Sequence, residues 1–294
     1  MKKLIVIAMS ITVFGCGNNS NGVSVTISDN KKSGMEEKSV VKIKDSDFLV
    51  ESIFNQERRD IADQVISVFE NNNPIIQYDY VEDLQDGRGY TAGRAGFTSA
   101  TADMLEVIER YSAVAPKNGL AAYIPRLKEL AKTENGSTDG LEGLEKNWKK
   151  AAKDSVFRKI QDDVVDAYYF NSAIKYAKQL GISLPITLLN LYDAAIQHGD
   201  GYDADSLSAM VKRATSKAGG SPKTGVDERL WVQAFMNDRR STLLNPANKE
   251  TQKEWAESVG RIDTLIKLYQ DGNIMLKPPV KMNPWGTAFS LPMR

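Results

Sequence analysis

Two acidic residues, Glu70 and Asp86, stand 16 positions apart and flank a stretch rich in β-branched and aromatic side chains. Direct hydrolysis of a glycosidic bond needs a protonated acid on the leaving oxygen and a carboxylate that activates water from the opposite face. Two such carboxyl groups stand roughly 6.5 to 9.5 Å apart. The pair is therefore a candidate for acid–base catalysis on a polysaccharide.

Each acid also has an ordinary structural explanation. A glutamate in the last turn of a helix is most often a solvated surface residue, and an aspartate before a glycine is most often a turn former. Glu82 and Asp83 are two further carboxylates in the same segment. Spacing alone does not choose among the four.

The elements around the two acids predict different surroundings for them. Apolar residues at helical spacing predict a helix that ends at residues 71–74, so Glu70 lies in its last turn. The negative end of the helix dipole and the apolar neighbour Ile66 would raise the pKa of Glu70. Asp86 lies in a glycine-rich turn with Arg88, where hydrogen bonds and a cation would keep it ionised.

The remaining pattern predicts a mainly α-helical protein with a small β-sheet, an α+β fold. Residues 75–84 contain the strand signal, and residues 85–89 the turn signal. Pro125 predicts a kink in the second of the later helices. These helices are expected over residues 101–114, 118–132, 141–152, 155–180, 185–198, 205–217, 226–244 and 250–270.

The N-terminal residues predict export from the cytoplasm. Residues 1–15 combine a basic start with an apolar run too short to span a membrane, which is typical of a signal peptide. Val13-Phe14-Gly15-Cys16 resembles a lipoprotein processing box, so a lipidated Cys16 would attach the protein to a membrane. An ordinary signal peptide with a chance cysteine is the alternative. Residues 16–46 suit a flexible tether, and residues 47–294 form the predicted catalytic domain.

Composition excludes several other classes. The 294 residues include 38 basic and 38 acidic side chains, which is not the footprint of a nucleic-acid-binding protein. The single cysteine allows no disulfide within the chain. The sequence contains no metal-type Cys/His cluster, phosphate-binding glycine loop or nucleophile elbow. We therefore expect neither a metal nor a cofactor.

Several separate segments together resemble the chitosanases of glycoside hydrolase family 46. The signature region comprises Phe69-Glu70-Asn71, residues 80–91 and Gly96-Phe97. Residues 101–106, 192–201, 217–222 and 245–248 also fall at the family's places. The resemblance runs from about Phe54 to near the C-terminus, and it selects Glu70 and Asp86 from the four carboxylates.

The resemblance implies a two-lobed, lysozyme-like fold with a central cleft for the substrate. It implies an endo-acting chitosanase that cleaves β-1,4 bonds of chitosan, a cationic polysaccharide, with inversion of configuration. Glu70 would be the general acid and Asp86 the general base. Thr91 matches the position that helps hold the attacking water, although a threonine is also common in a β-strand.

Further positions match the family around the sugar chain. Arg88 and Asp103 correspond to cleft positions, and an aspartate suits the protonated amines of chitosan. Tyr80 and Glu228 are further candidates for substrate binding. Each position also has a structural alternative. Arg88 could be a solvated turn residue and Asp103 a partner of the helix dipole. Tyr80 could pack in the core, and Glu228 could be an exposed helix charge.

Asp193 and Arg239 resemble members of a charged network that supports the acid. His198, the single histidine, lies in a family motif but is expected to be structural. Two other functions remain open: a surface lipoprotein that binds a cationic glycan without cleaving it, and a lysozyme-like peptidoglycan hydrolase. We expect a secreted or otherwise extracytoplasmic monomer, with or without a lipid anchor.

Overall fold

The structure is a computed structural model that describes residues 53–292. The predicted signal peptide, Cys16 and the tether over residues 16–46 lie outside the described residues, as does the predicted start of the domain at residue 47. In the part of the chain that is described, no helix is both long and apolar enough to span a membrane.

The first lobe combines a small sheet with short helices. Strands β1 (Val81–Asp83), β2 (Tyr90–Ala92) and β3 (Phe97–Thr98) form an antiparallel sheet in that order. Thr91 pairs with Glu82 on one side and with Thr98 on the other. Around the sheet lie α3 (Ala102–Val114), η1 (Ala121–Tyr123), α4 (Ile124–Thr133) and α5 (Leu144–Ala151).

The second lobe is a helical assembly around α8 (Pro185–His198). Pro185 begins α8, and every residue from there to Ile196 is buried, as expected for a helix that is apolar on most sides. Around α8 lie α2 (Gln56–Asn71), α9 (Leu207–Ala218), α10 (Glu228–Leu244), α11 (Gln252–Glu257) and α12 (Gly260–Gln270), with the hairpin β4 (Val280–Met282) and β5 (Phe289–Leu291) beside α2 and α12.

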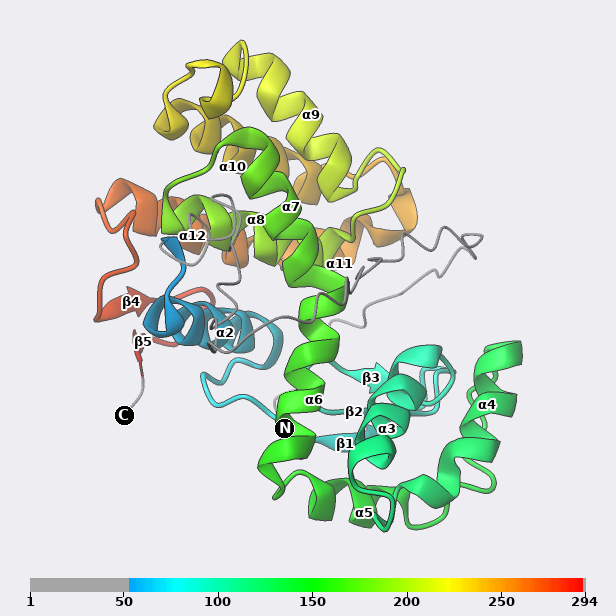
Figure 1. Cartoon of the computed structure of the whole chain (residues 1–294). Helices are drawn as coiled ribbons and strands as arrows, with labels where there is room; N and C mark the ends of the chain where they lie inside the picture. The colour runs from blue at the N-terminus through cyan, green and yellow to red at the C-terminus, as the bar shows by residue number, and fades with distance from the viewer. Residues whose placement is uncertain (1–52, 293–294) are drawn as a thin grey trace, which may run out of the picture.

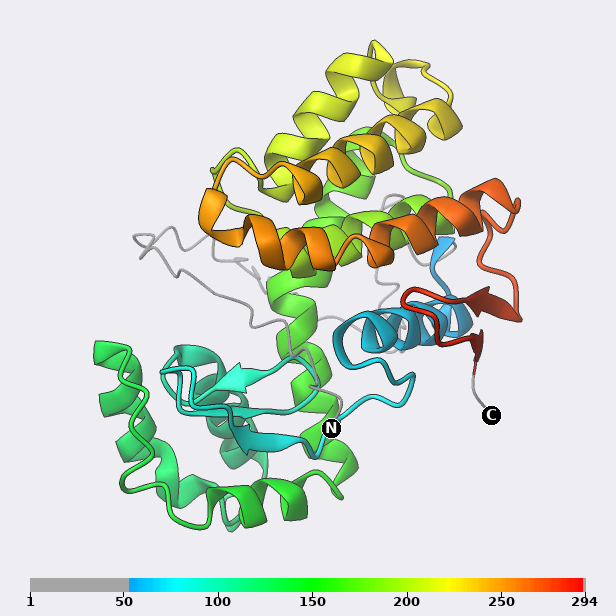
Figure 2. The same cartoon turned by 180° about the vertical axis from the view of Figure 1, so that it is seen from behind.

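One nearly continuous helical rod runs through both lobes (Figures 1 and 2). It consists of α6 (Ser155–Val165), a π-helical segment η2 (Asp166–Phe170) and α7 (Asn171–Leu180). The α6 part packs on α3 in the first lobe, and α7 packs on α8 in the second. The wider π-helical turn therefore lies where the rod passes from one lobe to the other.

The predicted fold class, mainly α-helical with a small sheet and two lobes, is confirmed. Two local predictions were wrong, and the expected strand is present but short. Pro125 lies in the first turn of α4, where a missing N–H costs nothing, instead of bending a helix. The helix predicted over residues 250–270 is interrupted near Ser258 and Val259, between α11 and α12. The strand signal over residues 75–84 yields a strand of only three residues.

Candidate active site

Glu70 lies in the last turn of α2, as predicted. The side chain of Asn55 caps the start of this helix by accepting a hydrogen bond from the backbone N–H of Arg58. The helix ends at Asn72, whose left-handed backbone (φ 49°) is typical of a helix end. The Glu70 side chain is 14% exposed, and its Oε1 accepts a hydrogen bond of 2.6 Å from Nη2 of Arg261. Helix geometry thus places the carboxyl group against α12.

A buried charge network continues behind Glu70. Arg261 on α12 also donates to Oδ1 of Asp193 on α8, at 2.8 Å, and Asp193 Oδ2 lies 2.6 Å from Nη2 of Arg239 on α10. The side chains of Arg261, Asp193 and Arg239 are all 0% exposed. With Glu70 ionised, the two arginines and two carboxylates balance in charge. Buried charges of this kind persist only when they are paired.

The pKa values of Glu70 and Asp193 are shifted in opposite directions. Burial raises the pKa of Glu70, although its ion pair with Arg261 works against that rise. Burial would also raise the pKa of Asp193, but two flanking arginines outweigh it and the pKa is lowered. Asp193 therefore stays ionised, whereas Glu70 keeps its proton to a higher pH than an ordinary glutamate. The direction for Glu70 agrees with the prediction from sequence, but its main cause is burial.

Arg239 is held by residues from the end of α8. Its Nη2 donates to Oε1 of Gln197 at 2.6 Å, and its Nε donates to Nε2 of His198 at 3.3 Å. Burial, together with the adjacent arginines, lowers the pKa of His198 well below its usual range. The neutral imidazole can then accept the arginine N–H, so His198 lies in the supporting network.

Asp86 lies in the turn between β1 and β2, in the other lobe. Its Oδ1 accepts the backbone N–H of Arg88 at 3.1 Å, and its Oδ2 lies 2.6 Å from Nη2 of the same residue. The Asp86 side chain is 32% exposed. These hydrogen bonds from Arg88 lower the pKa of Asp86, against the opposing effect of partial burial. Asp86 is therefore an ionised carboxylate near neutral pH.

Close backbone packing holds this turn in place. Gly89 has φ +70°, and a side chain there would come within 2.3 Å of Ser99 Oγ. A side chain on Gly136 would come within 2.0 Å of the Gly87 carbonyl oxygen. Glycine is required at Gly89 and Gly136 because the chain segments approach each other too closely for a Cβ. The exposed Asp86 thus rests on a constrained backbone.

Thr91 and Tyr80 lie in the same lobe as Asp86. Thr91 is 1% exposed, and its Oγ1 is a buried atom with no hydrogen-bond partner among the described residues. The hydroxyl of Tyr80 donates to Oε2 of Glu82 at 3.1 Å. Burial, that hydrogen bond and the negative charges of Glu82 and Asp86 raise the pKa of Tyr80 to about 12.

Asp103 and Glu228 are both engaged in contacts within the fold. Oδ1 of Asp103 accepts the backbone N–H groups of Thr98 and Met104, at 3.1 and 2.8 Å, and burial raises the pKa of this carboxyl group. The carboxylate of Glu228 accepts three hydrogen bonds from Ser183 and Leu184, between 2.6 and 2.9 Å, and so fastens the start of α10 to the α7–α8 loop. The structure does not bring Glu228 together with Glu70 or Asp86 through any contact of its carboxylate.

Among residues 53–292, no group of three or more His, Cys, Asp or Glu side chains is arranged to hold a metal ion. The site contains the buried carboxyl group of Glu70, which contacts Arg261, and the ionised carboxylate of Asp86 in a constrained turn. The family model of glycosyl hydrolase family 46 matches residues 64–280, which include both. The chain belongs to glycosyl hydrolase family 46.

Chitosanases from other organisms are similar to this chain in sequence, and two of them with solved structures are also similar in fold. A chitosanase of Bacillus subtilis strain 168 is 46% identical over 234 residues, which cover 79% of this chain and 84% of the relative. A Gynuella sunshinyii chitosanase, solved as a complex with chitotetraose, is 54% identical with a TM-score of 0.72, over 82% of this chain and 99% of that one. A mutant chitosanase of Bacillus subtilis MY002, complexed with 6 GlcN, is 44% identical, also with a TM-score of 0.72, over 81% and 99%. The fold is therefore the lysozyme-like α+β fold of the family.

The interpretation of the sequence missed Arg261, the direct partner of Glu70. A signal for it exists: Arg261, Leu265 and Leu268 recur at positions i, i+4 and i+7, so this arginine lies on the buried face of α12. A charged residue on an apolar helix face is almost never fully buried without a partner. The pattern could have indicated a buried ion pair, although not its partner.

Proposed function

We propose that this chain is an endo-acting chitosanase that hydrolyses β-1,4-glycosidic bonds of chitosan with inversion at the anomeric carbon. The observation that carries the proposal is that the pKa of Glu70 is raised and that of Asp86 is lowered, in a chain of glycosyl hydrolase family 46. Inverting hydrolysis needs one protonated and one ionised carboxyl group. The chitosanases with bound chitotetraose and 6 GlcN support chitosan as the substrate.

Glu70 acts as the general acid. Burial favours its protonated form, and Oε1 is occupied by the guanidinium of Arg261, so Oε2 is the oxygen left to carry the proton. As the bond between the anomeric carbon and the glycosidic oxygen breaks, the proton moves from Glu70 to that oxygen. The carboxylate that remains is stabilised by Arg261. Asp193 and Arg239 hold Arg261 in place, and thus act as positioning residues.

Asp86 acts as the general base. It takes a proton from a water molecule whose oxygen bonds to the anomeric carbon on the face opposite the leaving group. Thr91 holds this water: its buried Oγ1 has no partner in the described fold, and a buried hydroxyl is expected to bind protein or water. The two carboxyl groups come from different lobes, so the sugar chain lies between the lobes.

We expect acidic and aromatic side chains of this chain to bind the sugar units of the substrate. Chitosan carries protonated amines, and Asp103 with Tyr80 would contact sugars beside Asp86, with Arg88 positioned at the same turn. For Asp103 this role falls to Oδ2, since Oδ1 is bonded to backbone N–H groups. For Glu228 we favour the structural role, because its carboxylate is occupied by Ser183 and Leu184.

The test is digestion of chitosan by the purified protein, followed by proton NMR of the first products. Inversion of a β-linkage predicts that the α-anomer appears first and then equilibrates. Release of no reducing ends would instead identify a protein that only binds the glycan. A fall in cell-wall turbidity without chitosan cleavage would identify a peptidoglycan hydrolase. Early β-anomer would overturn the inverting mechanism alone.

We also propose that the protein is exported, lipidated at Cys16 and monomeric. The support is the signal-like segment over residues 1–15 and the single cysteine at its end. Mass spectrometry of the mature N-terminus tests the anchor, and an unmodified start beyond Cys16 would overturn it. Size-exclusion chromatography with light scattering tests the monomer.

A further inference from the structure

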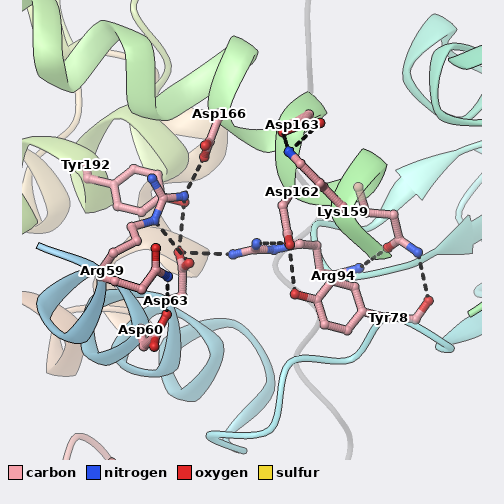
Figure 3. Close-up of polar contacts among 12 residues, drawn as sticks. Arg59, Asp60, Asp63, Tyr78, Arg94, Lys159, Asp162, Asp163, Asp166 and Tyr192 are labelled. Carbon is pink, nitrogen blue, oxygen red and sulfur yellow. Dashed lines mark hydrogen bonds and ion pairs between the residues drawn. The ribbon is translucent and has the colours of Figure 1, made fainter. Parts of the chain in front are cut away.

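Arg94 forms a charged bridge between the two lobes (Figure 3). It lies in the loop between β2 and β3, and its side chain is only 5% exposed. Its Nη2 lies 3.0 Å from Oδ1 of Asp63 on α2, and its Nη1 contacts Asp162 on α6. Its backbone N–H donates to Oε1 of Gln161 at 3.1 Å. One guanidinium group therefore joins the sheet, the rod and α2.

Asp63 is itself held firmly within the second lobe. Its Oδ2 lies 3.0 Å from Nε of Arg59, one turn earlier on α2, and its Oδ1 accepts a hydrogen bond of 3.2 Å from the hydroxyl of Tyr192 on α8. The Arg59 guanidinium stacks 3.9 Å from the centre of the Phe170 ring and pairs with Asp166. The Asp63 carboxylate is thus a fixed point of the second lobe.

The bridge lies where the chain crosses between the lobes. One crossing is the segment from α2 to β1, in which the hydroxyl of Tyr78 donates to Asp162 at 2.9 Å. The other is the rod, whose π-helical turn begins at Asp166, four residues after Asp162. π-Helical turns are frequent at functional sites. The Asp63–Arg94 pair adds a non-covalent connection beside these two covalent ones.

Open space borders the bridge. A cavity of about 750 Å³ lies beside it, and its lining includes Arg59, Asp63, Tyr78, Asp162 and Asp166. Asp162 and Asp166 are 35% and 37% exposed on this side. The ion pairs of Arg94 thus lie at the border of a solvent-accessible space between the lobes.

We propose that the Asp63–Arg94 ion pair locks the angle between the two lobes and so positions Glu70 and Asp86 for catalysis. The proposal rests on the function proposed above. Asp63 and Glu70 lie seven residues apart on α2, and therefore on the same face of one rigid helix. Arg94 follows β2 by two residues, and Asp86 precedes the same strand in the β1–β2 turn. The pair connects the element of the acid directly to the element of the base.

The Asp63–Arg94 pair matters because the reaction depends on the distance between the carboxyl groups of Glu70 and Asp86, which lie on different lobes. An inverting site must keep them roughly 6.5 to 9.5 Å apart, with a water between. A displacement of about 1 Å can lower a rate by about 100-fold. A small rotation of the lobes would change this distance while leaving each lobe folded.

The experiment compares Asp63→Asn with the matched control Asp162→Asn. Both changes remove one carboxylate partner of Arg94. Asp63 binds it from the second lobe, whereas Asp162 lies on α6, which packs on α3 in the first lobe. We expect Asp63→Asn to lower kcat about 10- to 100-fold, and Asp162→Asn to retain kcat within about threefold of wild type. Thermal unfolding measured alongside should show the larger destabilisation for Asp63→Asn, because Asp63 is more buried than Asp162 and also pairs with Arg59.

A distance measurement separates a lock from ordinary stabilisation. Nitroxide labels at cysteines replacing the exposed residues Lys146 on α5 and Lys212 on α9, in the full chain with Cys16→Ser, report the inter-lobe distance by double electron–electron resonance. We expect a narrow distribution for wild type and Asp162→Asn, and a broader or displaced one for Asp63→Asn. An unchanged distribution for Asp63→Asn, or equal losses of kcat in both variants, would overturn the proposal.

Arg94→Lys is the second variant, in case Asp63→Asn does not fold. Lysine keeps the charge but cannot make the two-sided contact of a planar guanidinium. We expect the same broadening with a smaller loss of kcat, and a wild-type distribution would overturn the lock. The distances need no substrate, so they still test the lock if the wild-type protein fails to cleave chitosan.

Discussion

Glu70 and Asp86 carry the same functional group in opposite surroundings. Glu70 is 14% exposed and touches Arg261, the first member of a buried network on three helices. Asp86 is 32% exposed and is held within its own turn by Arg88. The surroundings of Glu70, in the second lobe, thus come from residues far away in the sequence. Those of Asp86, in the first lobe, come from a residue two positions away.

The comparison shows how one chain prepares both an acid and a base. An arginine lies beside each carboxyl group, so the cation alone cannot explain the difference. Burial decides it: the loss of hydration outweighs Arg261 at Glu70, whereas Arg88 outweighs the slight burial of Asp86. Activity should therefore fall at high pH as Glu70 loses its proton, and at low pH as Asp86 gains one.

The largest expected effect comes from removing either proposed catalytic group. Glu70→Gln and Asp86→Asn should each lower kcat on chitosan by roughly 10² to 10⁴-fold, because general acid–base catalysis contributes about that much. Asp83→Asn is the control, since Asp83 is an exposed carboxylate in the same segment. Initial rates of reducing-end release give the comparison. Near-normal cleavage by either proposed catalytic variant would refute the assignment.

The next largest effect tests the buried charge network behind Glu70. Asp193→Asn leaves two buried arginines short of a carboxylate and should lower the free energy of unfolding by about 3–5 kcal/mol. The negative charge of Asp193 raises the pKa of Glu70. Its removal should therefore lower that pKa and move the high-pH limb of kcat/KM to lower pH.

Asp238→Asn is the matched control for this prediction. Asp238 pairs with Arg213 and Lys217, which are 37% and 60% exposed. Asp238 is itself buried, but water screens its two exposed partners, so we expect a smaller loss in urea unfolding than for Asp193→Asn and no movement of the high-pH limb. If Asp193→Asn leaves that limb in place, the network stabilises the fold without setting the acid.

The difference between the lobes also explains what could be predicted from sequence. Apolar spacing located the end of α2 and thus Glu70, and the Asp86-Gly87 turn is local as well. Arg261 lies 191 positions from Glu70 in the chain, and Arg94 meets Asp63 on an element of the other lobe. Periodicity assigns a residue to the buried face of an element but does not identify its partner on another element.

A similar limit applies to the secondary structure. Pro125 was predicted as a kink from a helical pattern that began too early, because the η1 turn preceding α4 has similar local composition. The β4–β5 hairpin was not predicted: its strands are three residues long and are positioned by packing on α2 and α12. Short elements of this kind depend more on tertiary contacts than on propensity.

A smaller effect tests the base side of the comparison through Thr91. Thr91→Val removes a hydroxyl that has no partner in the described fold, so stability should hold or rise slightly. If that hydroxyl binds the attacking water, kcat should fall about tenfold, as expected for one hydrogen bond of about 1.4 kcal/mol. Thr98→Val on β3 is the matched control, because Thr98 Oγ1 is bonded to Thr101 at 2.7 Å.

The control should show the reverse pattern: a loss of about 1 kcal/mol in stability and an unchanged kcat. Melting curves and initial rates at saturating chitosan measure the two properties separately. Equal kcat values for Thr91→Val and wild type would remove Thr91 from the mechanism and leave Asp86 to position the water alone.

The smallest effect concerns the local side of the comparison. Arg88→Ala removes the side-chain hydrogen bonds and the positive charge that lower the pKa of Asp86, so that pKa should rise. Asp86 would then bind a proton at a higher pH, and the low-pH limb of kcat/KM should move upward while the high-pH limb, set by Glu70, stays in place. Arg88→Lys keeps a positive charge beside Asp86 and should move the low-pH limb less. A shift of both limbs together would mean that the acid and the base do not titrate independently, and the division between a buried network and a local turn would fail.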